Sequence, residues 1–197
     1  MARANVGSPP AWAGAGIEVP AGALALALLR LGADPRWTTW LALTPDRSVP
    51  WPPGFGVLPQ GKGDLGERMA RVARLIPAPG PVLIVGADIP GITTGAVARA
   101  FRALGDHDAV FGPAADGGYW AVGLRRRPRF QDPFRDVRWS TEHALADSLA
   151  NLAGASVAML DFMDDVDDAE SLRRHSPGSS FIRPVAVDRA AFPLIPP

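Results

Sequence analysis

The sequence contains no cysteine, and its few histidines are far apart. The lack of cysteine excludes disulfide bonds, zinc sites with thiolate ligands and catalysis by a thiol nucleophile. His107, His143 and His175 show none of the close spacings that are typical of a metal site. Thiol enzymes and zinc proteins of the Cys-ligated kind are therefore excluded.

An excess of charge and long apolar runs are also absent. The 20 basic and 20 acidic side chains balance, which argues against a nucleic-acid or anionic-membrane surface, because both need a basic excess. A small anionic ligand needs only a local basic patch, and a net charge of zero does not exclude such a patch. The longest apolar stretch, Ala21–Leu29, is about half the roughly 20 residues of a membrane span, and Glu18 and Pro20 interrupt any signal peptide. We expect a cytoplasmic protein.

Short apolar runs alternate with helical patterns from about residue 38 onward. The 197 residues are enough for one domain with a substantial core. Alternating strands and helices predict an α/β fold, with a mostly parallel sheet between two helical layers. The predicted strands are Thr38–Leu43, Val82–Val85, Ala109–Phe111, Tyr119–Leu124 and Val157–Leu160.

Capping residues mark where the predicted helices begin. Asp64 with Glu67 has the spacing of a capping box, Thr93 or Thr94 precedes the next helix, and Ser140 the one after it. Less regular helical patterns cover residues 21–31 and 168–174, and the Pro/Gly-rich stretch 51–63 is interpreted as a loop.

One domain is predicted over residues 1–175, of which 1–33 form an atypical opening rich in Gly, Ala and Pro. Residues 176–197 contain several prolines and no periodicity. This tail is expected to wrap the surface, to dock on a partner or to be disordered. The sequence does not decide the oligomeric state, and a homodimer is compatible with it.

Asp88 follows the buried strand Val82–Val85 and is the first candidate functional residue. In open α/β sheets, ligands bind beyond the carboxyl ends of the strands. A carboxylate there suits a hard divalent cation whose other ligands are phosphate oxygens and water. The alternative is that Asp88 caps the turn before Pro90. Position alone leaves both interpretations open.

Three further segments each allow a functional and a structural interpretation. Asp116 precedes two glycines, which permit close approach to a ligand but also form hairpin turns. The glycines between Gln60 and Asp64 lead into a helix N-terminus, where a phosphate or a base carbonyl can bind, or form a plain flexible loop. The acidic run Asp164–Glu170 either completes a metal site with Asp88 or caps a helix.

Five stretches, in this order, resemble the DUF2064 family of glycosyltransferase-A-like bacterial proteins: PQGKGDLGERM, VLIVGADIPGIT, DAVFGPAADGGYW, VRWSTEHAL and DVDDAESL. They span roughly residues 34 to 174, and five in register are far more specific than any one. The resemblance implies a Rossmann-like nucleotide-diphospho-sugar transferase fold of three α/β/α layers. It also implies kinship with the nucleotidyltransferases of molybdenum and deazaflavin cofactor synthesis, including phospholactate guanylyltransferase.

The resemblance also implies roles for individual residues. Asp88 matches the main Mg²⁺ or Mn²⁺ ligand and is thereby a candidate catalytic residue, and Asp167 and Glu170 match an acidic pair that helps to hold the metal. The loop of Gln60, Gly61, Gly63 and Asp64 falls where relatives approach the base of the nucleotide. The acceptor side is implied to consist of Asp116, Gly117, Gly118 and Tyr119, with Asp116 as candidate general base.

The opening of the chain departs from the family pattern. Members usually begin with a strand and a basic loop, K-x-P-x-P-G-x-x-K-T-R-L, whereas here the first twenty residues contain no lysine and only Arg3. Each lost charge-assisted phosphate contact costs roughly 1.5–3 kcal/mol. Whether the first strand is missing as well is left open.

Two hypotheses about function follow from these observations. One is a metal-dependent glycosyl- or nucleotidyltransferase that uses a nucleotide-sugar or a nucleoside triphosphate and a small-molecule acceptor. The other is a catalytically degenerate ligand-binding or interaction protein on the same fold.

Overall fold

The computed structural model describes residues 29–43, 55–77, 79–86, 89, 92–163 and 183–188. Asp88, Asp167 and Glu170 lie outside these ranges, as do the helix predicted over 168–174 and most of the one predicted over 21–31. Of the latter, residues 29–33 are helical. No helix in the described ranges is long and apolar enough to cross a membrane.

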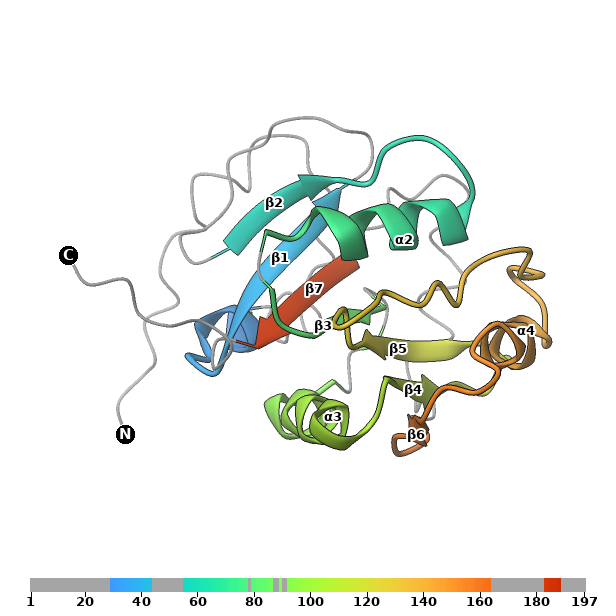
Figure 1. Ribbon diagram of the computed structural model, residues 1–197. Coiled ribbons are helices and arrows are strands. Elements are labelled where there is room, and N and C mark those ends of the chain that lie inside the picture. Colours follow the sequence, from blue (N-terminus) through green and yellow to red (C-terminus); the bar gives the residue numbers. More distant parts are fainter. Residues whose placement is uncertain are drawn as a thin grey trace, which may run out of the picture.

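A mixed sheet of seven strands forms the middle of the described structure, in the order β2-β1-β7-β3-β5-β4-β6 (Figure 1). Five strands share one direction, and β5 and β7 run against them, so two of the six neighbouring pairs are parallel and the sheet is mixed rather than mostly parallel. The strands are β1 (Trp37–Leu43), β2 (Phe55–Pro59), β3 (Val82–Val85), β4 (Ala109–Pro113), β5 (Tyr119–Leu124), β6 (Val157–Met159) and β7 (Arg183–Asp188).

Helices α2 (Leu65–Leu75), α3 (Thr94–Asp106) and α4 (Ala144–Ala150) cover the two faces of this sheet. Because side chains alternate along a strand, Ile84 in β3 joins the core under α2 and α4, while its neighbour Val85 joins the core under α3. All four side chains of β3 are buried, as expected for a strand covered on both faces. The predicted three-layer α/β/α fold is confirmed.

Two of the predicted helix starts are confirmed by their hydrogen bonds. The Glu67 amide donates to Asp64 Oδ1 at 2.8 Å, and the Asp64 amide donates to Glu67 Oε2 at 3.0 Å, which completes the capping box of α2. For α3, the Ala96 amide donates to Thr93 Oγ1 at 3.1 Å, so Thr93 is the N-cap. These local bonds satisfy amides that have no partner inside the helix.

The third predicted cap, Ser140, is wrong. Helix α4 begins at Ala144 with His143 at the N-cap position, and Ser140 has a φ of +60°. Thr141 makes the local bonds instead, accepting at Oγ1 from the His143 amide at 3.2 Å. The chain therefore turns once more before the helix begins.

The stretch interpreted as a loop contains a strand, β2, at one edge of the sheet. Register pairs Gly56 with Trp40 of β1, and any Cβ at Gly56 would overlap the Trp40 ring. Proline is tolerated at an edge because an edge strand has one unpaired side. The glycine and proline that suggested a loop are therefore compatible with this edge strand.

The tail contributes a strand that the sequence did not reveal. Strand β7 lies in the centre of the sheet, antiparallel to both β1 and β3 (Figure 1). In a doubly wound sheet of order 3-2-1-4 the first strand occupies this central place. Pro184 obscured the strand, because proline is normally excluded from paired central strands. Residues 183–188 thus belong to the sheet rather than to a separate tail.

Candidate functional site

The carboxyl ends of β2, β3, β4 and β6 lie at one edge of the sheet, because these strands run in the same direction. Gln60 directly follows β2, the turn Ala114–Gly118 follows β4, and β3 ends at Val85, just before Asp88 in the sequence. Ligands of open α/β sheets bind at such an edge. The predicted site segments therefore come from strand ends that share this edge.

Gln60 ties the first of these segments to the end of β1. It is 2% exposed, its amide donates to the Leu43 carbonyl at 2.9 Å, and its Nε2 donates to the Ala42 carbonyl at 2.9 Å. Arg71 of α2 donates to the Gln60 carbonyl at 2.6 Å. The side-chain nitrogen of Gln60 thus anchors the loop to the sheet.

The rest of this segment, residues 61–64, turns sharply into α2. Gly61 and Gly63 have φ values of +74° and +113°, a region that favours glycine. The Asp64 carboxylate accepts the capping bond described above, so its first role is to fix the helix start. The N-terminus of α2 presents backbone amides and the positive end of the helix dipole at this edge.

A small apolar hollow lies between α2 and the sheet, next to Gln60. Its walls come from the ends of β1 and β3 and from the first turns of α2, with Arg68 at its border. The apolar residues that line it are Ala42, Leu65, Met69, Val72 and Ile84.

Asp116 forms the turn between β4 and β5 with its own side chain. The Gly118 amide donates to Asp116 Oδ1 at 2.9 Å, and the Ala114 amide donates to the Gly118 carbonyl at 3.2 Å. The structural interpretation of this aspartate is thereby confirmed. Because Asp116 is exposed, its carboxylate is also reachable by a ligand, and the catalytic role stays a prediction.

The same turn packs against the segment before α4. Gly117 has a φ of +81°, and a Cβ there would overlap the backbone of Glu142. The Leu145 amide donates to the Gly117 carbonyl at 3.1 Å. The hydroxyls of Tyr119 and the fully buried Ser148 are 3.3 Å apart. Both the backbone conformation and the close contact require glycine at position 117.

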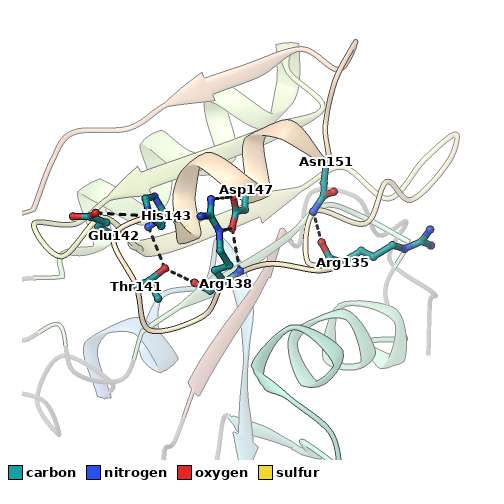
Figure 2. Close-up of polar contacts among 7 residues, drawn as sticks. All are labelled: Arg135, Arg138, Thr141, Glu142, His143, Asp147 and Asn151. Atoms are coloured by element: carbon teal, nitrogen blue, oxygen red, sulfur yellow. Dashed lines mark hydrogen bonds and ion pairs between the residues drawn. The ribbon is translucent and has the colours of Figure 1, made fainter.

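Arg138 and Asp147 hold the segment before α4 in shape (Figure 2). The guanidinium donates to both carboxylate oxygens, from Nε at 2.9 Å and from Nη2 at 2.8 Å, and the Arg138 amide adds a third bond at 3.0 Å. These hydrogen bonds from Arg138 hold the pKa of Asp147 well below the usual range of a carboxyl group. Thr141 Oγ1 donates to the Arg138 carbonyl at 2.7 Å and closes the turn.

His143 lies at the surface. Its side chain is 46% exposed and faces that of Glu142, with Nε2 and Oε1 3.7 Å apart. At the other end of α4, Asn151 donates to the carbonyl of Pro133 at 3.1 Å and to that of Arg135 at 2.6 Å (Figure 2). Both ends of α4 are thus fixed to the loop of residues 133–143.

Trp139 contacts the elements that directly follow the Gln60–Asp64 loop and the Ala114–Gly118 turn. The sequence did not predict this contact. The Trp139 ring meets Tyr119 edge to face at 6.4 Å between centroids. On the other side, a Cβ at Gly66, the second residue of α2, would lie 2.8 Å from the Trp139 ring. From the sequence, Trp139 in the motif VRWSTEHAL is interpreted first as a core aromatic before a helix cap and secondarily as the wall of a pocket.

The residues predicted to bind metal cannot be placed, because Asp88, Asp167 and Glu170 lie outside the described ranges. Within those ranges, no three His, Asp or Glu side chains gather closely enough to hold a metal ion. A parallel bridge joins Ala114 to Met163. Met163, the last described residue before the acidic run, therefore lies beside the turn of Asp116.

Comparisons with known proteins agree with this architecture. The family model described as "Uncharacterized protein conserved in bacteria (DUF2064)" matches residues 25–141, more than half of the chain. Among solved structures, the chain is similar to a protein of Desulfovibrio desulfuricans G20 provisionally assigned as a nucleotide-diphospho-sugar transferase, with 32% identity and a TM-score of 0.52. The similarity covers 58% of this chain and 52%, about half, of that one. No curated protein matches.

Proposed function

The chain belongs to the DUF2064 family of bacterial proteins, and we propose that it is a metal-dependent transferase acting on a nucleotide-sugar or a nucleoside triphosphate. The observation that carries the proposal is the common edge of the sheet, from which both the Gln60–Asp64 loop and the Ala114–Gly118 turn emerge. The similarity to a provisionally assigned nucleotide-diphospho-sugar transferase favours a nucleotide-sugar as the donor.

The Gln60–Asp64 loop is assigned to the nucleotide. Its anchoring through Gln60 and the capping of α2 by Asp64 hold backbone amides in place before any ligand arrives. Such amides at a helix N-terminus suit a phosphate or the carbonyl of a base.

The Ala114–Gly118 turn is assigned to the acceptor. The exposed Asp116 carboxylate would take the proton of an attacking acceptor hydroxyl, since a carboxylate within hydrogen-bond reach can act as a general base. The side-chain bond to Gly118 holds this carboxylate in one orientation. Close packing around Gly117 keeps the turn in place.

The metal is assigned to Asp88, with Asp167 and Glu170. Carboxylate oxygens are the ligands that Mg²⁺ and Mn²⁺ prefer. The bridge between Ala114 and Met163 supports this set, because Met163 directly precedes the acidic run and lies at the proposed site edge. When bound, the ion would offset negative charge on the phosphates of the donor.

One feature of the sequence favours a second candidate, a ligand-binding protein without turnover. The first twenty residues contain a single basic side chain, Arg3. Phosphate groups are usually bound by several basic side chains or backbone amides. A site with few basic side chains around the phosphates would still bind a nucleotide but would stabilise the transition state poorly.

Thermal unfolding with Mn²⁺ and a panel of nucleotide-sugars and nucleoside triphosphates tests the proposal. A ligand at 100 times its dissociation constant stabilises the native state by about 2.7 kcal/mol, so at least one pair should raise the unfolding temperature. Asp88→Asn should abolish the metal-dependent part of that increase. The control is Asp106→Asn, because Asp106 ends α3 at the opposite edge of the sheet.

Turnover is then measured as release of the nucleotide from a nucleotide-sugar donor, or as release of pyrophosphate from a nucleoside triphosphate donor. Metal-dependent stabilisation with turnover supports the transferase, and stabilisation without turnover supports the ligand-binding alternative. No metal-dependent effect with any nucleotide would overturn the transferase proposal.

A further inference from the structure

Trp139 contacts the two elements that directly follow the loops to which nucleotide and acceptor are assigned. One side of its ring faces Tyr119, which directly follows the Ala114–Gly118 turn. The ring also reaches α2, where Gly66 is the second residue after the Asp64 cap. One indole ring therefore spans the space between the start of α2 and the start of β5.

The contact with α2 depends on the absence of a side chain at position 66. A Cβ at Gly66 would lie 2.6 Å from the Phe134 carbonyl oxygen, 2.8 Å from Trp139 Cζ2 and 3.0 Å from its Nε1. Distances this short leave no room for a methyl group, so the helix and the ring are in direct contact. Phe134 supports the ring further, with 6.3 Å between the two centroids.

Packing alone holds the indole ring. Its Nε1 is buried and has no hydrogen-bond partner among the described residues. A buried donor without a partner is unfavourable, so the ring contributes through its shape rather than through a hydrogen bond. A smaller aromatic ring can therefore replace it without loss of a polar contact.

The segment that carries Trp139 is itself rigidly held. Arg138, its neighbour, is bound to Asp147 in α4 by two side-chain hydrogen bonds. Leu145 and Ser148 of α4 contact the residues Gly117 and Tyr119. The ring thus projects from a fixed base, and a change in the distance between the starts of α2 and β5 would have to displace it.

We propose that Trp139 is a positioning residue that sets the separation between the Gln60–Asp64 loop and the Ala114–Gly118 turn. Reactions between two bound molecules depend on this kind of separation, because the reacting atoms must be held close and aligned. The assignment of the two loops to nucleotide and acceptor rests on the proposed function, whereas the spacing role does not.

The chain has no cysteine, which allows the separation to be measured directly. Cysteines placed at the exposed positions Lys62 and Ala115 carry nitroxide labels, and pulsed electron paramagnetic resonance gives the distance between them. We expect a single narrow distance in the otherwise native chain. Trp139→Ala should broaden or displace this distribution, and Trp139→Phe should restore most of it.

Two matched comparisons separate spacing from general loss of structure. Phe130→Ala removes an aromatic residue from the same core without contact to either loop and should leave the distance unchanged. Gly66→Ala adds a methyl group against the ring and should displace the distance. Gly105→Ala, at a helical glycine with open space around it, should not. Because Gly66→Ala perturbs the contact without removing the ring, it keeps the test valid if Trp139→Ala fails to fold.

A distance that stays unchanged in both folded Trp139→Ala and Gly66→Ala would overturn the spacing role. This readout needs no ligand, so it stands or fails independently of the transferase proposal. With a donor that is turned over, Trp139→Ala should lower kcat by roughly 10-fold to 100-fold. The dissociation constant of Trp139→Ala for the nucleotide should change by no more than about a factor of two. The contacts that bind the nucleotide equally well in the ground state and in the transition state are kept in this variant.

Discussion

At the scale of single residues, Asp116 shows how one carboxylate serves two purposes. One oxygen accepts the Gly118 amide and shapes the turn, while the exposed position leaves the group open to solvent and to a ligand. Asparagine keeps an oxygen for the same hydrogen bond but cannot take up a proton. The structural and the catalytic purposes can therefore be separated by substitution.

Asp116→Asn should unfold at nearly the same temperature as the wild type, whereas Asp116→Ala loses a hydrogen bond that contributes about 0.5–1.5 kcal/mol. If the carboxylate is the general base, Asp116→Asn lowers kcat by roughly 10²–10⁴-fold. Thermal unfolding and donor turnover of both variants provide the measurement. Wild-type turnover in Asp116→Asn would contradict the base role.

At the scale of elements, the segment from Arg138 to Asp147 depends on a carboxylate with a lowered pKa. Hydrogen bonds from Arg138 favour the ionised form of Asp147 in the folded state. The stabilisation is therefore present at pH values above the ordinary carboxyl pKa of about 3.9 and is lost as the pH falls below it. Because Arg138 is largely exposed, solvent and salt reduce its size.

Asp147→Asn should consequently be less stable than the wild type at pH 7, and the difference should shrink as the pH falls through about 3.9 towards the lower folded-state pKa. Urea unfolding midpoints at pH 7, 5 and 3 measure it. Asp161→Asn is a suitable control, since that carboxylate makes a more exposed ion pair with Arg99. A difference that is constant across this range would show that the Arg138 bond is not its source.

At the scale of the whole molecule, strand β7 joins the two halves of the sheet. It pairs with β1 on one side and with β3 on the other, so the only strand contact between these halves in the described structure passes through it. Removing β7 would leave the facing backbone N–H and C=O groups of β1 and β3 without hydrogen-bond partners. Buried backbone groups without partners destabilise the folded state. The ends of β1 and β3, which flank the proposed nucleotide site, would lose their common support.

A chain that ends at His175, the limit of the domain predicted from sequence, should therefore lose cooperative unfolding and nucleotide-dependent stabilisation. A chain that ends at Asp188, the last residue of β7, should keep both. Circular dichroism during thermal unfolding distinguishes the two outcomes. Equal unfolding temperatures for the two chains would show that β7 is dispensable.

Local patterns in the sequence determined much of this protein. The buried run of β3, the capping box of Asp64 and Glu67 and the cap at Thr93 depend on neighbouring residues, so periodicity and spacing predicted them correctly. The alternation of strands and helices likewise predicted the three layers. The segments named as site loops follow strands that end at one edge, because strand direction determines where a loop emerges.

Only the tertiary structure decided how distant segments meet. Strand β7 contains a proline and became a strand because two ladders were available on either side of it. Gly66 and Trp139 are 73 positions apart in the sequence, and nothing local indicates that a missing Cβ on one makes room for the ring of the other. Such contacts arise from packing between elements, and packing depends on the arrangement of the whole chain.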